Sequence, residues 1–261
     1  MSRFKELEPV ALVARWSVGE LLWSPRTLAM VALAGAPLGL ALAYRVALAF
    51  RVTETDGAEV FAALVSGVLF PFVAPMLSLV YASGVVRDDV EAGTMPYFLT
   101  RPLSRASFLS GKMLASFTMT LALVLPSLVL VYYVVLSPSG WGEVGARFPN
   151  LARNLGVAAL GLAAYNGIFA LAGTVLKRPV LAGLFFIFGW QAVATFVPGR
   201  ARLATVAHYM SSLTPGSSSG GVFAGLVGER SSPLMSILAL ALIAGSTHAL
   251  ALAAFAKKEV R

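Results

Sequence analysis

The chain has 261 residues, of which 58% are hydrophobic and only 12% are charged, whereas about a quarter of the residues of a soluble domain carry charge. Its apolar residues gather in long runs, which predicts that lipid is their solvent. The net charge of +8 does not indicate a nucleic-acid partner, because the Lys and Arg residues stand at the ends of these runs. The absence of cysteine excludes disulfides, a thiolate nucleophile and a cysteine metal site.

Residues 1–25 are predicted to form an amphipathic helix. Apolar residues recur at spacings of three and four from Phe4 to Leu21, and charged residues occupy much of the remaining surface of the helix. Trp16 and Trp23 are residues of a type that favours the membrane interface. We therefore expect this helix to lie on the membrane surface before the chain enters the bilayer.

Six apolar stretches follow, each long enough at about 1.5 Å per residue to approach or exceed the hydrocarbon thickness of about 30 Å. The first contains Gly35 and Gly39, a pair of small residues that permits close helix packing. The second contains Pro71 and Pro75, which should bend its helix. The predicted spans are 27–50, 60–86, 108–136, 151–176, 180–197 and 233–256.

The sequence thus predicts an all-α integral membrane protein with six transmembrane helices, a single domain over residues 1–261. A Gly/Ser-rich segment at 198–232 is predicted to be an external loop. Six spans place both termini on one side. If that side is the cytoplasm, it holds 13 of the 20 Lys and Arg residues, as the positive-inside rule requires.

Segment 87–106 is the longest polar interruption on the predicted cytoplasmic side. Asp88 followed three residues later by Glu91 has the pattern of a helix N-cap, and we expect a short amphipathic helix to begin there. One face of that helix would carry its large apolar residues, Met95, Phe98 and Leu99.

The end of the same segment has residues that should end the short helix and begin the third span. Pro102 should end the short helix, and Ser104 can cap the third span. Arg101 and Arg105 are suited to the negative end of a helix dipole. On these features alone the segment is either a solvated charged loop or an element that docks on a partner.

The motif residues of this segment favour the second interpretation. Its order, an E-G-T, an apolar run, an Arg-Pro, a Ser-Arg and a Gly-Lys, resembles the cytoplasmic signature of the type-2 ATP-binding-cassette (ABC) exporter permeases. The N-terminal helix resembles the connecting helix of that family, so the resemblance spans nearly the whole chain. One departure is Pro96, where the family more often has an acidic or helix-favouring residue. The motif residues are Glu91, Gly93, Thr94, Tyr97, Phe98, Leu99, Arg101, Pro102, Ser104, Arg105, Gly111 and Lys112.

The resemblance implies a permease subunit of an ABC exporter in a bacterial inner membrane. Its partners would be a cytoplasmic ATPase subunit, which binds ATP and Mg, a second permease subunit of the same or a similar kind, and membrane lipids. Segment 87–106 would then be a coupling helix that docks on the ATPase. The implied docking residues are Asp88, Glu91, Gly93, Thr94, Met95, Phe98, Leu99, Arg101 and Arg105.

Signals of catalysis in this chain are weak. Gly111-Lys112 is followed by Met113 and has no glycine at the upstream position of a Walker loop. The sequence has only two histidines and no HExxH motif, so it offers few ligands for a histidine metal site. We expect neither catalysis nor a metal site, and we expect ATP hydrolysis to occur in the partner.

Polar residues inside the predicted spans have two possible roles, hydrogen bonding between helices or contact with a substrate. The lack of mid-span carboxylates argues against an ion-coupled transporter, and the sparse polarity suggests a lipid-like, hydrophobic or peptide substrate. The alternative function is a membrane anchor through which the ATPase drives a periplasmic or membrane partner without transport. The candidate substrate-path residues are Ser78, Tyr81, Tyr165, Asn166 and Gln191.

Overall fold

The structure is a computed structural model that describes residues 2–53, 55–91, 104–190, 193, 203–214 and 231–257. Within these ranges the chain forms helices and no strand, which confirms the all-α class. Five helical stretches are long and apolar enough to cross a membrane. They are Pro25–Ala49, Gly57–Asp88, Arg105–Ser139, Phe148–Val175 and Pro233–Lys257.

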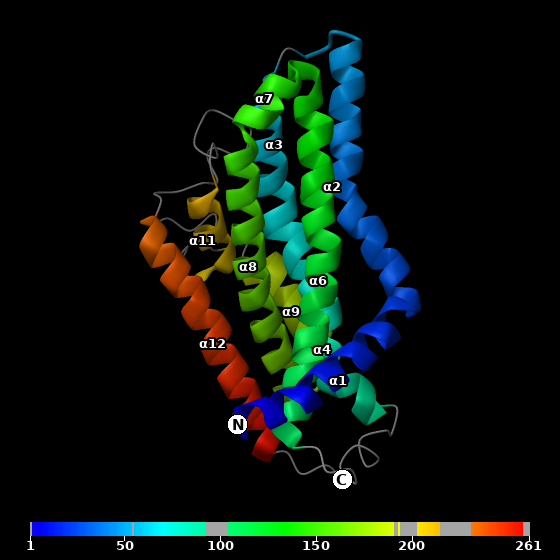
Figure 1. Cartoon of the computed structure of the whole chain (residues 1–261), viewed down its shortest axis with the longest axis vertical. Coiled ribbons are helices and arrows are strands. Elements are labelled where there is room, and N and C mark those ends of the chain that lie inside the picture. Colours follow the sequence, from blue (N-terminus) through cyan, green and yellow to red (C-terminus); the bar gives the residue numbers. More distant parts are fainter. Residues whose placement is uncertain are drawn as a thin grey trace.

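Helix α1 (Ser2–Leu22) lies across one end of the bundle, at a steep angle to the long helices (Figure 1). We refer to this end as the α1 end and to the opposite one, near α7 (Trp141–Ala146), as the α7 end. The inner face of α1 buries Val13, Ala14 and Ser17 and packs on α6, while Leu12 and Trp16 are exposed. The chain then turns at Ser24, whose hydroxyl caps α2 (Pro25–Ala49).

The second predicted span is built from three successive pieces, α3 (Gly57–Leu64), the π-helical η1 (Val65–Val73) and α4 (Ala74–Glu91). Pro71 lies in the π-helical piece. Proline has no N–H and clashes with the preceding turn, so a local change of hydrogen-bond register is a normal way to accommodate it. The described part of helix α4 extends to Glu91, five residues beyond the predicted end of the span.

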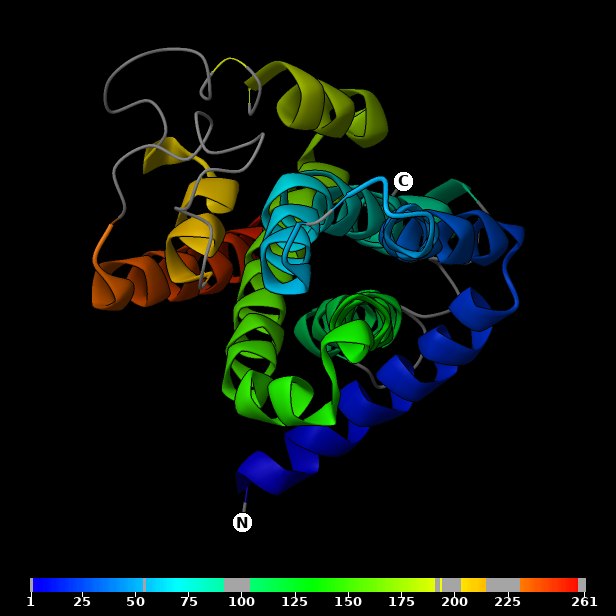
Figure 2. The same cartoon turned by 90° about the horizontal axis from the view of Figure 1, so that it is seen from above.

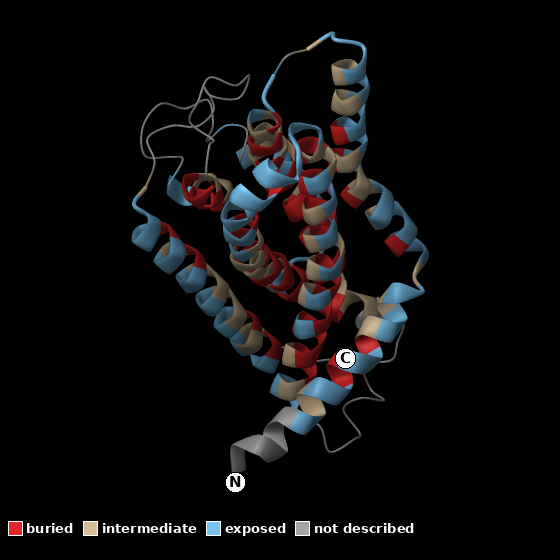
Figure 3. Cartoon of the chain, turned by 45° about the horizontal axis from the view of Figure 1, so that its top comes forward, coloured by how far each residue is buried: buried red, intermediate tan, exposed pale blue. Residues whose placement is uncertain are grey.

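Helices α6 (Arg105–Leu136) and α8 (Phe148–Val175) form the centre of the bundle together with α4. Seen along the bundle, α6 lies between α1, α2, α4 and α8 (Figure 2). Burial is concentrated on these central helices, whereas α2 and α12 (Pro233–Lys257) face outward along much of their length (Figure 3). Only 22% of the most apolar stretch of α2 and 11% of that of α12 are buried, as expected of helices that border lipid or a partner.

The third predicted span begins as expected. Ser104 is the N-cap of α6, and its hydroxyl oxygen accepts a hydrogen bond from the N–H of Ser107 at 3.0 Å. A local pattern of this kind needs no tertiary partner. The predicted cap is therefore confirmed.

The described part of the fifth predicted span is too short to cross a membrane. It contains α9 (Pro179–Leu184) and the π-helical η3 (Phe185–Trp190), one apolar helix of 12 residues. At about 1.5 Å per residue this helix is about 18 Å long, less than the hydrocarbon thickness of about 30 Å. Apart from Val193, the rest of the predicted span lies outside the described residues.

The predicted external loop at 198–232 contains a helix. Helix α11 (Val206–Leu213) packs against α8 and α12 and buries Tyr209 and Met210. Met210 lies in space that is open because residue 161 is glycine. This part of the segment therefore belongs to the bundle.

Candidate functional site

The predicted coupling segment leaves and re-enters the bundle at the α1 end. Asp88 and Arg105 stand at the ends of α4 and α6 that face this side (Figure 1). The prediction that Asp88 begins a new helix is wrong, because α4 continues unbroken to Glu91, where its described part ends. Six predicted docking residues lie outside the described residues: Gly93, Thr94, Met95, Phe98, Leu99 and Arg101.

Asp88 pairs with Arg26 at the start of α2. The Nη1–Oδ2 distance is 2.7 Å, and the side chains are 56% and 39% exposed, respectively. A cation at a helix start and an anion at a helix end are each disfavoured by the dipole of their own helix, and the pairing offsets both effects. Gly84 makes room for the carboxylate, since a Cβ there would lie 2.6 Å from Asp88 Oδ2. The pair ties the end of α4 to the start of α2.

Two further side chains tie the ends of the segment to the bundle. Arg87 donates a hydrogen bond to the carbonyl of Lys177, in the turn after α8. Arg105 donates to the carbonyl of Ala256 near the end of α12, at 3.4 Å. Together with the Arg26–Asp88 pair, these contacts connect the base of segment 87–106 to α2, to α12 and to the end of α8.

Gly111 and Lys112 seat α1 on α6. A Cβ on Gly111 would lie 2.7 Å from Cβ of Val13 and 2.8 Å from the carbonyl oxygen of Val10, so glycine permits the close approach of the two helices. Lys112 is only 8% exposed. Its ammonium is 3.9 Å from Glu20 Oε2 and 5.5 Å from the centroid of the Trp16 ring, within cation–π range.

A cavity of about 250 Å³ lies where α1, α2, α4 and α6 meet. Ser17 lines it with a buried hydroxyl that has no hydrogen-bond partner among the described residues. The Tyr81 hydroxyl, also at the wall, donates to Thr27 Oγ1 at 3.1 Å. We call the charged and polar residues around this cavity the junction: Ser17, Glu20, Ser24, Arg26, Tyr81, Asp88, Lys112 and Ser116.

Deeper in the bundle, Asn166 on α8 is the centre of a buried hydrogen-bond network. Its Oδ1 accepts from Ser116 at 3.0 Å, and its Nδ2 lies 3.2 Å from Ser78 Oγ and 3.0 Å from Thr120 Oγ1. The four side chains join α4, α6 and α8, and each is at most 3% exposed. We call them the Asn166 cluster.

The candidate substrate-path residues have different surroundings in the structure. Ser78 and Asn166 make hydrogen bonds between helices, and so does Tyr81. Tyr165 is fully buried, with its ring stacked at 6.2 Å on that of Phe169. Gln191 lies outside the described residues. A role of these residues in a substrate path stays a prediction.

The sequence interpretation missed two members of the cluster, Ser116 and Thr120. Their signal is a spacing of four, which places two hydroxyls on the same face of α6. This spacing predicts that α6 makes a polar contact at that face. It does not identify Asn166, 46 residues after Thr120, as the residue that makes the contact.

The comparison with known families agrees with the motif at 91–112. The sequence model of the ABC-2 family transporter proteins matches residues 24–260. This range includes all five candidate membrane spans, the coupling segment and every member of the Asn166 cluster. No curated protein matches the chain. Since the match covers nearly all of the sequence, the chain belongs to the ABC-2 family of transporter proteins.

Proposed function

We propose that the chain is the permease subunit of an ABC exporter and that segment 87–106 couples it to a separate cytoplasmic ATPase. The ATPase would bind ATP and Mg and supply the energy. In this proposal the α1 end faces the cytoplasm of a bacterium, both termini lie there, and the predicted span 180–197 completes the set of six. The excess of Lys and Arg on the predicted cytoplasmic side supports this orientation.

The observation that carries the proposal is the set of contacts at the base of the segment. Asp88 pairs with Arg26 on α2, Arg87 donates to the Lys177 carbonyl, and Arg105 donates to the Ala256 carbonyl. A force applied to segment 87–106 would therefore act on several membrane helices together. Helix α1, seated on α6 at Gly111, would move with them and serve as a second lever on the membrane surface.

A second permease subunit would complete the path. Helix α2 is largely exposed, and the space beside Gly35 and Gly39 is open, with no atom of the rest of the described chain within 4 Å of a Cβ placed there. This leaves a small-residue face available to another helix. The few polar residues inside the bundle favour a lipid-like, hydrophobic or peptide substrate.

The test replaces the proposed docking face with charge. Phe98→Glu with Leu99→Glu should lower ATPase retention during purification, or transport per ATP hydrolysed, at least tenfold, because two buried apolar contacts become carboxylates. The matched control is Trp141→Glu with Phe148→Glu, two exposed apolar residues at the α7 end. The control should retain both properties.

Unchanged complex formation and transport in the Phe98/Leu99 variant would overturn the proposal. A wild-type complex that hydrolyses ATP in vesicles but moves none of the candidate substrates would instead favour the membrane-anchor function. Reconstituted vesicles with lipid, hydrophobic and peptide substrates separate these results.

A further inference from the structure

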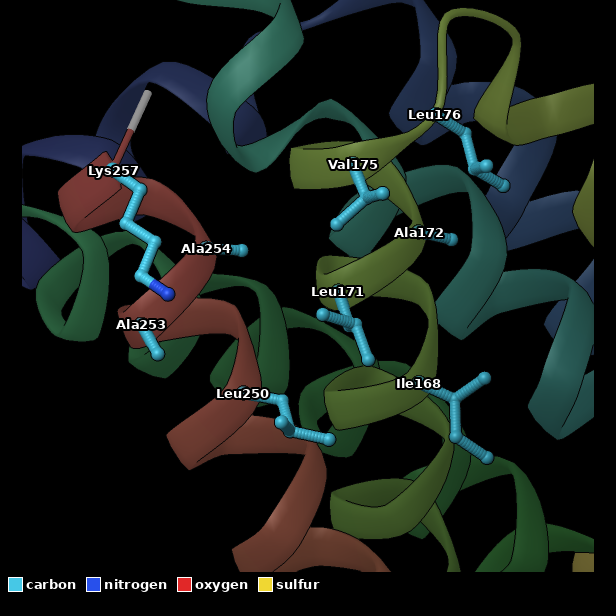
Figure 4. Close-up of a pocket in the computed structure, with 9 residues that line it drawn as sticks. All are labelled: Ile168, Leu171, Ala172, Val175, Leu176, Leu250, Ala253, Ala254 and Lys257. Atoms are coloured by element: carbon cyan, nitrogen blue, oxygen red, sulfur yellow. The ribbon is translucent and has the colours of Figure 1, made fainter. Parts of the chain in front are cut away.

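A groove of about 570 Å³ opens between α8 and α12 at the α1 end (Figure 4). Its walls are apolar side chains such as Leu171 and Val175 from α8 and Leu250 from α12. Among the described residues that line it, Lys257 at the end of α12 is the one with a charged side chain. The groove shares no lining residue with the junction cavity.

The sequence builds this groove by bringing the two helices together and then separating them. They touch at Gly167, where a Cβ would lie 3.2 Å from Cβ of Thr247. Closer to the α1 end, α12 leans instead on α6, where the rings of Phe255 and Phe108 stack at 6.3 Å. Small residues of α12, Ala253 and Ala254, leave the resulting space unfilled (Figure 4).

The groove has the size and position of one lipid leaflet. Along the end of α8 and its C-cap residue, the groove extends from Ile168 to Leu176, about 12 Å at about 1.5 Å per residue. Half of a hydrocarbon core of about 30 Å is about 15 Å. Val175 and Leu250 are 59% and 56% exposed, so the groove faces outward from the bundle. An acyl chain entering from the surrounding lipid would lie along apolar walls over nearly its whole depth in that leaflet.

Positive charge lies at the end of the groove nearest the membrane surface. The Lys257 side chain folds back along α12, with its nitrogen near Ala253 and Ala254 (Figure 4). Within the described part of the chain, no carboxylate pairs with this ammonium. Lys177 and Arg178 follow the groove residue Leu176. The dipoles of α8 and α12 place about −0.5 charge at the end of each helix. The positive charges of Lys177, Arg178 and Lys257 are larger, so the net charge at this end of the groove is positive.

We propose that the groove binds one acyl chain of an anionic phospholipid whose phosphate pairs with Lys257. Apolar walls select a lipid over a soluble anion, and the lysine selects an anionic headgroup over a neutral or zwitterionic one. This lipid is a resident of the groove and not the exported substrate. Its binding depends on neither the ATPase nor the export function, so the two proposals succeed or fail separately.

Native mass spectrometry of the delipidated full-length chain tests this site. The protein is titrated with dioleoyl phosphatidylglycerol and, in parallel, with dioleoyl phosphatidylcholine. One near-surface lysine predicts about fivefold tighter binding of the anionic lipid. Lys257→Gln should remove this preference by weakening phosphatidylglycerol binding about fivefold, and it should change phosphatidylcholine binding less, because the choline ammonium already offsets the phosphate charge of that lipid. Ala254→Phe, which fills the groove, should weaken binding of both lipids.

Two matched variants control for general effects. Arg153→Gln removes an exposed cation near the other end of α8, and Ala249→Phe adds the same ring at an exposed position of α12 outside the groove. Both should bind lipid like the wild type. Equal binding of the two lipids by the wild type, or an unchanged preference in Lys257→Gln, would overturn the proposal.

A second copy of the chain in the groove would also overturn it. Since the chain has no cysteine, Leu250→Cys gives a single reactive position on the groove wall. We expect this variant to form no disulfide-linked dimer in vesicles. Efficient dimer formation would show that protein and not lipid covers the groove.

Discussion

The interior of the bundle and its α1 end use polar side chains in opposite ways. The Asn166 cluster is neutral, fully buried and hydrogen bonded among helices α4, α6 and α8. The junction instead carries four charged side chains, of which Arg26 and Glu20 are each 56% exposed. Buried neutral networks fix which helices lie side by side, whereas partly hydrated ion pairs can exchange partners at little cost. The first region holds the bundle together, and we expect the second to be the one that rearranges during coupling.

Ser116 connects the two regions. It lines the junction cavity, and its hydroxyl donates to Asn166 Oδ1 at 3.0 Å. A shift of α6 at the junction would therefore reach the cluster directly. The following predictions ask whether stability and coupling can be changed separately in the two places.

The largest change in stability should come from Asn166→Leu. The substitution removes the hydrogen bonds that join three helices, which should lower the free energy of unfolding by about 1–3 kcal/mol. If Asn166 only joins helices, transport per ATP in the complexes that remain folded should stay near the wild-type value; if Asn166 contacts the substrate, transport should fall as well. Thermal unfolding in detergent measures the first quantity, and vesicle assays measure the second.

The control for that variant is Asn150→Leu, at an exposed position near the start of α8. Its free energy of unfolding should change by no more than about 0.5 kcal/mol. An Asn166→Leu protein as stable as this control would contradict the structural role of the cluster.

A second effect should follow from Gly111→Ala. The added Cβ meets the Val10 carbonyl at 2.8 Å, and backbone atoms cannot rotate away, so α1 must lift from α6. We expect the free energy of unfolding to fall by about 1–2 kcal/mol, seen as faster hydrogen exchange in α1 than in the other helices. Gly156→Ala is the matched control, since no atom lies within 4 Å of its Cβ. That change should be neutral or stabilise α8 by up to about 1 kcal/mol.

The smallest change in stability should come from the Arg26–Asp88 pair. Both side chains are partly exposed, so Arg26→Gln should cost less than about 1 kcal/mol. Transport per ATP should nevertheless fall severalfold, because the base of the coupling segment loses its contact with α2. The exchange of the two charges, Arg26→Glu with Asp88→Arg, should restore part of the coupling.

The control for the pair is an ion-paired cation at the other end of the bundle. Arg147 Nε lies 3.0 Å from Glu143 Oε2 and Arg147 Nη2 lies 3.4 Å from Asp56 Oδ2, and the hydrogen bond with Glu143 raises the pKa of Arg147. Arg147→Gln should leave transport per ATP unchanged. Equal losses in Arg147→Gln and Arg26→Gln would show that the junction has no special part in coupling.

Features set by local sequence or by lipid could be predicted, and features set by tertiary contact could not. Hydropathy located the long helices because lipid admits only long apolar stretches, and the Ser104 cap followed from the residues beside it. The end of α4 was predicted too early because charged residues do not by themselves end a helix. Asp88 lies beyond the apolar stretch but remains helical and pairs with Arg26, which is 62 residues away in the sequence. Helix α11 was missed because eight residues carry little periodicity and are held by packing on α8 and α12.

The central claim, that the coupling segment docks on an ATPase, is tested most directly by photo-crosslinking. A photoreactive amino acid is placed at position 98 in the permease, which is then purified with its ATPase and irradiated. The same amino acid at position 141, at the exposed α7 end, serves as the control. The account predicts an adduct with the combined mass of the two proteins from position 98 and none from position 141. An adduct from position 141, or none from position 98 in an intact complex, would contradict it.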